Sequence, residues 1–369
     1  MSEHAAIEVR REPLSALAQS VFPVFEAQDV YLPNVCVYEN VHEYNADFAR
    51  HLLKDIYIER TVHFPRVDLV TLPPGTVVHG DHGYVTTVGD VFLEEQFHPV
   101  WHPPQIPQVL ASVAPEIRIT GDALLLARFG ATTWGHWLGE LVPRAVVAEL
   151  VAPGKYKFVI PDDLGTRTSG NFLQALHAYG IGDDRLIRID QTHRYVFDRL
   201  ATVSSMWIYP YAMQPKALAL MRNNIKVGLP VISGATAAVA ALRQSFGVRY
   251  IENHDEIRSF LKIKKFSAVD IGSLPFVEQV ALFQKAYTLF GELGSNLTGL
   301  IYSPLGVKAV SVAPGDWGDC FFHGLMQAQA GKYADVRGTP KPGAENPNFA
   351  PFMPSIVRLA EALEAVGYI

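Results

Sequence analysis

The sequence predicts an α/β protein of two domains, each built on a doubly wound parallel sheet, with β-hairpins added to the first. Short apolar runs alternate with amphipathic stretches along most of the chain, as they do where helices connect parallel strands. With 369 residues the chain is also longer than a single core usually needs. The expected domains are residues 1–212 and 213–350, and residues 351–369 are expected to add a C-terminal helix.

Composition limits the classes of function. Apolar residues make up 49% and charged residues 18% of the chain, which suits a soluble globular protein. The net charge of −6 does not favour binding to nucleic acid. Cys36 and Cys320 lie far apart and lack metal-type spacing, so a reducing compartment is expected, with a single bridge between them as the alternative. Neither a signal peptide nor a membrane-spanning helix is expected, because no window approaches the ~18 apolar residues that a span needs.

Hairpins are expected over residues 35–96, where glycines separate short alternating runs. Four histidines lie in or just after this region, namely His79, His82, His98 and His102. Spacings of three and four residues can suit a metal ion, so an unrelated metal-dependent enzyme is one alternative. Prolines beside the last two histidines exclude a regular helix, and 13 histidines in one chain make chance clusters common.

After the hairpins the first domain is expected to alternate between strands and helices. A strand at 123–128 leads into a helix that begins near Gly135 and is kinked or divided at Pro143. A strand at Val159 and Ile160, a helix at 169–179 and a strand at 186–189 follow.

The second domain is predicted mainly from residues 215–312. Helices are expected at 215–226 and, in a run rich in small residues, at 235–246. Asn253 and Glu256 have the spacing of a capping box. The clearest alternation consists of strands at 266–270, 287–291 and 307–312, a helix at 275–286 and a short helix ending before Pro304.

The turn at 291–296 is the first candidate for a ligand site. It connects a strand to a helix, and in a parallel sheet such a turn lies where strands end and where the helix presents free N–H groups. The alternative is that Gly291 and Gly294 only permit a sharp turn.

Three segments, in order, resemble glycosyltransferase family 61. The run PFVEQVALFQKAYTLFGELGSNLTGLIYSPLGVKAVSVAP at 275–314 is similar to the family's C-terminal signature of helix, strand, Gly-rich loop and closing strand. ATTWGHWLGELVPRAVV at 131–147 resembles the family's Gly-His-Trp helix. RYIENHDEI at 249–257 resembles its Arg-x-x-x-Asn-x-x-Glu segment.

The resemblance implies two Rossmann-like domains of the GT-B type that face each other across a cleft, with the last helix packing back toward the N-terminal domain. It implies an inverting enzyme that moves a hexose or pentose from a nucleotide-sugar donor to a glycan acceptor, in the synthesis of capsular or other surface or extracellular polysaccharide. No metal or other cofactor is expected. The expected location is cytoplasmic, with peripheral association at the inner face of the membrane as an alternative; the oligomeric state is not indicated.

In the first domain His136 is the candidate base that deprotonates the acceptor hydroxyl, because imidazole titrates in the useful range. Its alternative is a structural role at the helix start. Glu140 can orient the His136 ring, or it can form a surface ion pair with Arg144. Trp137 and Arg144 are candidates for contacting the acceptor, although Trp137 also suits the core.

In the second domain the candidate donor-binding residues lie around the 291–296 turn and on two neighbouring segments. They are Arg249, Glu278, Glu292, Gly294, Ser295, Asn296, Leu297 and Thr298. Backbone N–H groups at 295–297 would hold the diphosphate, the arginine would neutralise phosphate, and Glu278 would bind a ribose hydroxyl. The alternatives are a solvated loop cation for Arg249 and a helix-surface charge for Glu278.

Glu292 departs from the family pattern. The corresponding loop usually begins with His, and a carboxylate beside a diphosphate is repulsive. In the family, a Ser-Arg pair often ends the strand before the Arg249 segment. This chain has no clear match to that pair, and the nearest stretch of sequence is PVISG at 230–234. The alternative function is therefore a non-catalytic member that binds a glycan or a protein partner.

Overall fold

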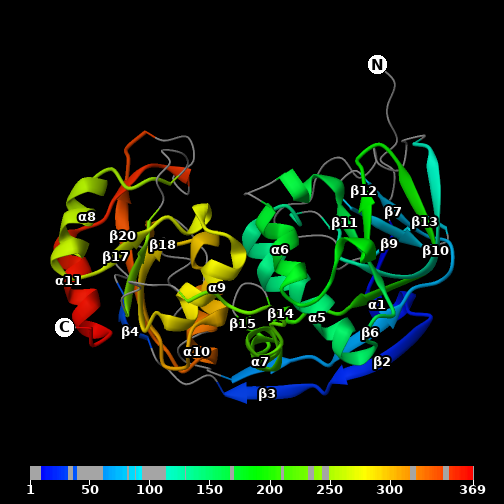
Figure 1. Cartoon of the computed structure of the whole chain (residues 1–369), viewed down its shortest axis with the longest axis horizontal. Coiled ribbons are helices and arrows are strands. Elements are labelled where there is room, and N and C mark those ends of the chain that lie inside the picture. Colours follow the sequence, from blue (N-terminus) through cyan, green and yellow to red (C-terminus); the bar gives the residue numbers. More distant parts are fainter. Residues whose placement is uncertain are drawn as a thin grey trace. The chain divides into compact units, whose positions relative to one another are not determined.

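The chain is a mixed α/β protein with parallel sheets (Figure 1). The computed structural model describes residues 10–31, 36–39, 61–80, 83–87, 89–93, 114–128, 130–166, 170–208, 212–231, 237–242, 249–315, 321–343 and 349–368. Contacts divide the chain into two units, Met1–Ala27 with Pro65–Ser205 and Gln28–Phe64 with Met206–Ile369. The second unit thus includes an early segment, and the units divide after Ser205, whereas the sequence suggested a division after residue 212.

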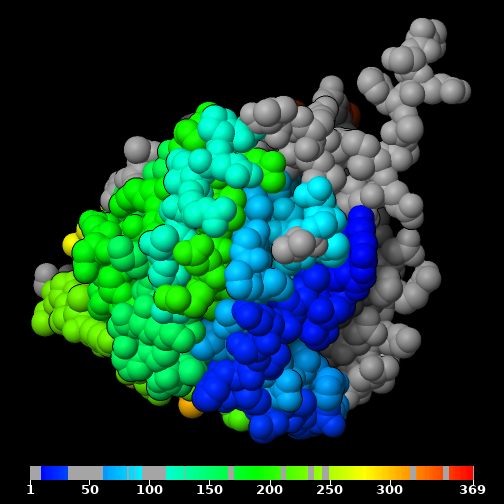
Figure 2. Space-filling view, turned by 90° about the vertical axis from the view of Figure 1, so that its right-hand side faces the viewer, coloured from blue at the N-terminus to red at the C-terminus, as the bar shows by residue number. Residues whose placement is uncertain are grey.

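The first unit contains one mixed sheet of ten strands. Its strands are β1 (Arg11–Glu12), β2 (Ser20–Phe25), β6 (Val67–Thr71), β7 (Thr76–His79), β8 (Val85–Thr87), β9 (Val91–Leu93), β10 (Glu116–Leu125), β11 (Lys157–Pro161), β12 (Leu186–Ile189) and β13 (Arg194–Val203). The order β13-β10-β11-β12 is parallel. The predicted hairpins are confirmed for β7, β8 and β9, which pair antiparallel. In Figure 2 the dark-blue residues of β1 and β2 lie at the surface beside the light-blue strands that they pair with.

The helices of the first unit cover this sheet where the sequence predicted crossovers. They are α1 (Leu14–Leu17), α4 (Trp134–His136), the π-helical η4 (Trp137–Leu141), α5 (Val142–Val151), and, after β11, η5 (Asp162–Thr166), α6 (Asn171–His177) and η7 (Asp183–Arg185). α5 contacts β13, and α6 contacts α5. One apolar core of this sheet includes Leu125, Val159, Phe197 and Leu200, all buried, together with Leu14 of α1.

The second unit contains a seven-stranded sheet in the order β17-β16-β18-β19-β20-β21, with β4 also pairing with β20. Its strands are β4 (Cys36–Glu39), β16 (Ala238–Ala241), β17 (Ser267–Val269), β18 (Thr288–Glu292), β19 (Lys308–Pro314), β20 (Lys332–Pro340) and β21 (Phe352–Met353). All neighbours except β20 and β21 pair in parallel. Two small sheets pair β3 (Gln28–Tyr31) with β5 (Thr61–Phe64) and β14 (Trp207–Ile208) with β15 (Ala212–Met213).

The helices of the second unit include ones predicted at 215–226, at 275–286, before Pro304 and near the C-terminus. They are α7 (Pro215–Asn223), α8 (His254–Ile263), η8 (Ile271–Ser273), α9 (Phe276–Lys285), the 3₁₀-helical η9 (Ser295–Tyr302), α10 (Phe321–Ala328) and α11 (Ile356–Ala365). None of the helices in the described part of the chain has the length and hydropathy that crossing a bilayer requires.

The helix predicted at 235–246 is wrong within the described residues, because Ala238–Ala241 form the strand β16. β16 lies between β17 and β18, and all four of its residues are buried. A parallel strand covered on both faces has no polar alternation, so a run of alanines and one valine carries no periodic signal. Burial in the middle of the sheet overrides the helix propensity of alanine here.

The last helix packs on its own unit. Leu359, Ala362 and Leu363 of α11 join the core that contains Val310 of β19 and Val336 of β20. The resemblance had instead implied packing toward the N-terminal domain. The apolar face of α11 is buried against β19 and β20 of the same unit, and the implied packing toward the N-terminal domain stays a prediction.

The capping box expected at the start of α8 does not form. The Asn253 side chain accepts no cap hydrogen bond; its amide donates to the Glu256 carboxylate (2.9 Å) and to the Pro354 carbonyl (3.2 Å). Asn253 thus connects the helix start to the segment before α11.

Candidate active site

The candidate base lies on a helix that changes its winding. The Val142 N–H donates to the Trp137 carbonyl, five residues back, at the end of the π-helical turn η4. Pro143 follows at once and cannot donate a backbone hydrogen bond. The break predicted at Pro143 is therefore confirmed as a local widening of the helix. Such π turns occur often at functional sites.

His136, Glu140 and Arg128 form a connected set in the first unit. His136 Nδ1 lies 2.5 Å from Glu140 Oε1, and Arg128 Nη1 donates to Glu140 Oε2 over 2.6 Å. The His136 side chain is 36% exposed, whereas Glu140 and Arg128 are 10% and 15% exposed. The prediction that Glu140 orients the His136 ring agrees with this geometry. Arg128 follows β10 directly and was not predicted, although a lone charge at the end of a buried strand is a usable signal.

The environment of Glu140 keeps its carboxylate ionised. Burial by itself would raise the Glu140 pKa, but the charges of Arg128, His136 and Arg144 and the hydrogen bond from His136 outweigh it and lower the pKa below the ordinary value. An ionised Glu140 can accept a hydrogen bond from Nδ1–H of His136, and in the tautomer with that proton on Nδ1 the other ring nitrogen, Nε2, can accept a proton.

Trp137 and Arg144 do not lie where an acceptor contact would need them. The Trp137 ring is fully buried, its Nε1 donates to the Phe172 carbonyl over 2.9 Å, and the two aromatic rings pack with centroids 5.8 Å apart. Arg144 is 6% exposed and its charge contributes to the lowered pKa of Glu140, so the predicted pairing of these two residues is not a surface one. Residue type alone could not separate these interior positions from the exposed face of the same helix.

The candidate donor segment lies where the second sheet reverses its order. The chain places β17 on one side of β16 and then β18, β19 and β20 in turn on the other. In such sheets ligands bind at the carboxyl ends of the strands beside the reversal, here β16 and β18. Gly291 in β18 pairs with Ala241 in β16, so the 291–296 turn starts at that point.

Two glycines permit the close packing of this segment. A Cβ on Gly291 would lie 2.7 Å from Leu297 Cδ2 and 3.2 Å from the Ala241 carbonyl oxygen. A Cβ on Gly299 would lie 2.1 Å from the Phe283 ring, so η9 packs directly on α9. Gly294 starts η9 with φ +135°, which is accessible mainly to glycine. The glycines therefore serve both the turn and the packing.

The predicted phosphate cradle is smaller than expected. The Leu297 N–H donates to the Gly294 carbonyl over 2.9 Å, and the side chains of Leu297 and Thr298 are buried. Ser295 and Asn296 are partly exposed and occupy the first turn of η9, where N–H groups have no intrahelical acceptor. These two residues remain the candidates for holding a diphosphate.

The other predicted donor residues belong to the same unit. Glu292 ends β18 and is 3% exposed. Glu278 is partly exposed in the first turn of α9. Arg249 has φ +61°, its N–H donates to the Phe349 carbonyl over 3.0 Å, and its guanidinium carbon lies 5.9 Å from the centre of the Phe349 ring.

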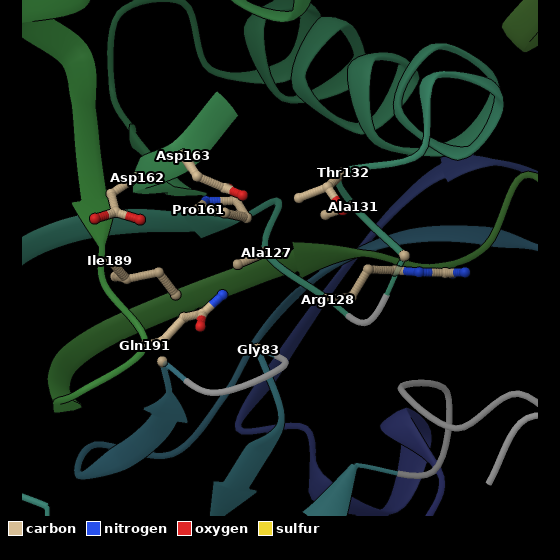
Figure 3. Close-up of a pocket in the computed structure, with 12 residues that line it drawn as sticks. Gly83, Ala127, Arg128, Ala131, Thr132, Pro161, Asp162, Asp163, Ile189 and Gln191 are labelled. Atoms are coloured by element: carbon tan, nitrogen blue, oxygen red, sulfur yellow. The ribbon is translucent and has the colours of Figure 1, made fainter. Parts of the chain in front are cut away.

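A cavity of about 140 Å³ opens in the first unit, at the carboxyl ends of β10, β11 and β12 (Figure 3). Its lining comprises Gly80, Gly83, Ala127, Arg128, Gly130, Ala131, Thr132, Pro161, Asp162, Asp163, Ile189 and Gln191. Arg128 belongs both to this lining and to the set around Glu140. A Cβ on the lining residue Gly130 would lie 3.5 Å from the His136 ring, which places the ring beside the cavity.

The metal alternative has one described histidine, His79. It is buried, its Nε2 lies 2.9 Å from Thr86 Oγ1, and its ring stacks on Phe92. Burial lowers the pKa of His79 to about 4, with a further contribution from Arg194. His82, His98 and His102 lie outside the described residues, and within these no three His, Cys, Asp or Glu side chains gather as a metal site would require.

Comparison with known proteins finds one family match. The model of Glycosyltransferase 61 matches residues 134–310, a range that starts in the His136 helix and ends in β19. Among solved structures the chain is similar to the iron-containing dodecameric glycosyltransferase TibC from enterotoxigenic E. coli, with 12% identity, 67% of this chain and 75% of TibC covered, and a TM-score of 0.27. No curated protein matches the chain. Residues 134–310 are thus similar to glycosyltransferase family 61, and this similarity supports glycosyl transfer as the general activity.

Proposed function

We propose that the chain is an inverting glycosyltransferase of the GT-B type, with acceptor and base in the first unit and a nucleotide-sugar donor on the second. The observation that carries the proposal is the ordered contact from Arg128 through Glu140 to His136. It gives a partly exposed imidazole a fixed tautomer and an ionised partner, as a general base requires.

His136 would act through Nε2. The ring accepts the proton of the acceptor hydroxyl while the hydroxyl oxygen attacks the anomeric carbon from the face opposite the leaving group. The bond from that carbon to the donor's diphosphate breaks, and the diphosphate leaves with the electron pair. Glu140 stabilises the imidazolium that forms, and Arg128 holds Glu140 ionised and in position.

The second unit would bind the nucleotide diphosphate at the start of η9. The N–H groups of Ser295 and Asn296 and the positive end of the helix dipole suit an anion. Arg249 is proposed to add positive charge, and Glu278 is proposed to accept a hydrogen bond from a ribose hydroxyl. The family resemblance leads us to propose that no metal ion takes part, so that EDTA leaves the rate unchanged.

The finer context is also proposed from the resemblance. The sugar moved is a hexose or pentose, the acceptor is a glycan of a capsular, surface or extracellular polysaccharide, and the reaction takes place on the cytoplasmic side, with peripheral membrane association as a variant of this location.

The proposal is tested by incubating the purified chain with nucleotide sugars and oligosaccharide acceptors and following product by mass spectrometry. Nuclear magnetic resonance of the new linkage gives its anomeric configuration, which should be opposite to that of the donor. A folded chain that binds glycan but forms no product with any donor would favour the non-catalytic alternative.

A further inference from the structure

The cavity beside His136 has polar side chains that proton transfer does not use. Apart from Arg128, these are Thr132, Asp162, Asp163 and Gln191. We propose that this cavity binds the reacting sugar unit of the acceptor, and that this unit is an uncharged sugar or an amino sugar, not an acidic one. The inference rests on the proposed function, because it identifies the acceptor class of the same site.

The size and position of the cavity suit one sugar unit. Its volume of about 140 Å³ is below the range of about 300–1,000 Å³ that drug-sized ligands occupy, so it accommodates a small polar group. It opens where three parallel strands end, next to the ring proposed as the base. A hydroxyl of a sugar held here would lie close to that ring.

The loop that carries Gln191 is fixed before any ligand arrives. Asp190 accepts hydrogen bonds from the Thr192 N–H (2.7 Å), the Thr192 hydroxyl (2.7 Å) and the Tyr195 hydroxyl (3.0 Å), and it contacts His193 Nδ1 at 2.8 Å. These bonds hold the Asp190 pKa well below its usual range. A side chain at Gly80 would collide with the Asp190 carbonyl, since a Cβ would lie only 1.7 Å away. The backbone that carries Gln191 is therefore held in place, which lowers the entropy cost of binding.

The side chains around the cavity can recognise hydroxyl groups. Figure 3 shows the carboxylates of Asp162 and Asp163 and the amide of Gln191 on one side and Thr132 on the other, while the Arg128 side chain extends away from them. Carboxylates accept hydrogen bonds from sugar hydroxyls, and the amide can both donate and accept. Such a lining suits the many hydroxyl groups of a sugar ring.

The charge of the lining disfavours an acidic sugar. Among the lining residues that the structure describes, Arg128 is the one cation, and Glu140 already lies 2.6 Å from it. Asp162 and Asp163 add negative charge at the opposite side. A uronate carboxylate would meet like charges there, whereas a hydroxyl or an ammonium group would not.

Saturation-transfer difference NMR with uncharged monosaccharides, glucosamine and the matching uronates tests the inference without a donor. At least one uncharged or amino sugar should bind, and its uronate should bind at least tenfold more weakly. Gln191→Ala should weaken the sugar at least tenfold. Asp162→Asn should also weaken binding of the sugar and should reduce the difference in affinity between the sugar and its uronate. Asp198→Asn, which changes an exposed carboxylate of β13, should leave both affinities unchanged.

Equal or tighter uronate binding, no binding of any sugar, or variants that bind like the wild type would each overturn the inference; circular dichroism confirms that the variants are folded.

Failure of the proposed function can be distinguished from failure of this inference. Sugar binding that is lost in Gln191→Ala, in a chain that turns over no nucleotide sugar, would refute transfer but keep the cavity as a sugar site. Turnover with an acceptor KM that Gln191→Ala leaves unchanged would refute the cavity alone.

Discussion

His136 gains its proposed role from its neighbours. A lone imidazole at a helix start is more often structural, but this ring contacts an ionised carboxylate that is itself held by an arginine. The His136 side chain is 36% exposed and Glu140 is 10% exposed, so the ring lies at the edge of a buried contact. Trp137, the next residue, is interior, so adjacent residues of one motif have different duties.

His136→Ala should lower the rate of transfer at least ~100-fold, because a positioned base contributes about that much or more. Nucleotide affinity should stay nearly unchanged, because His136 and η9 belong to different units. Turnover assays and calorimetry on the same preparation measure both quantities. A variant that turns over like the wild type would show that His136 is not the base.

Glu292→Gln should raise the affinity for nucleoside diphosphates about tenfold, the equivalent of about 1.4 kcal/mol, by removing a like-charge contact. Glu292 ends the strand that leads into the η9 turn and is almost fully buried, so the neutral side chain keeps the packing. Titration of both proteins with the same nucleotide gives the ratio. Weaker binding by the variant would mean that the carboxylate accepts a hydrogen bond from the ligand.

Sequence reasoning found the residues whose chemistry depends on local spacing. His136 and Glu140 are four apart on one helix, and their contact follows from that spacing. Arg128 reaches Glu140 only because β10 ends beside this helix, which is a tertiary fact. Gln191 and Asp162 meet at the cavity for the same reason, and no local pattern marks either of them.

Among the elements, η9 and α9 show how packing shapes a candidate binding site. The Gly-rich turn was predicted as a strand-to-helix connection, and it is one. The eight residues of η9 wind as a 3₁₀ helix. This winding could not be predicted from the sequence, because it depends on the tertiary contact between Gly299 and Phe283. β16 is an element whose type was predicted wrongly, because a strand of small buried residues has the composition of a helix. β13 was also not predicted, although it is ten residues long and pairs with β10 on one side and with β6 and β7 on the other.

Gly299→Ala should destabilise the chain by about 2 kcal/mol and weaken nucleotide binding, because the added methyl group collides with the Phe283 ring and displaces η9. Gly228→Ala is the matched control, since a Cβ there meets nothing within 4 Å. Urea denaturation and nucleotide titration provide the readouts. Equal effects of the two substitutions would refute the packing argument.

A buried polar network between β19, β20 and α10 should make stability pH-dependent. Asp335 accepts from Arg337 Nη2 (2.6 Å) and from the Ser311 hydroxyl (3.0 Å), and His323 Nε2 lies 3.7 Å from Asp335. Burial lowers the pKa of His323 to about 4; the Asp335 charge opposes this shift and the Arg337 charge adds to it. The unfolded chain therefore binds this proton at higher pH than the folded chain.

Neutral His323 contributes up to about 3 kcal/mol to the free energy of unfolding. This contribution is present in full above pH ~6.5 and is lost as the pH falls to about 4. Urea midpoints measured across this window should fall with decreasing pH, and His323→Gln should flatten the fall. An unchanged slope in the variant would show that His323 does not titrate as described.

Taken as one chain, the protein divides its proposed tasks between two units. The base, its partners and the cavity belong to Pro65–Ser205, and the diphosphate cradle belongs to Met206–Ile369. Because the two sets share no residue, substitutions in the first unit should change turnover, and those in the second should change nucleotide affinity, with additive free energies. A net charge of −6 also suits a site that obtains its anion affinity from N–H groups and a local arginine.

The assignment depends above all on whether the chain binds a nucleoside diphosphate. Isothermal calorimetry against uridine, guanosine, cytidine and thymidine diphosphates and their sugars answers this, with Gly299→Ala as the matched variant. We expect a micromolar dissociation constant for one base, kept in His136→Ala and weakened in Gly299→Ala. No binding of any nucleotide by a folded chain would contradict the donor site and, with it, the transferase.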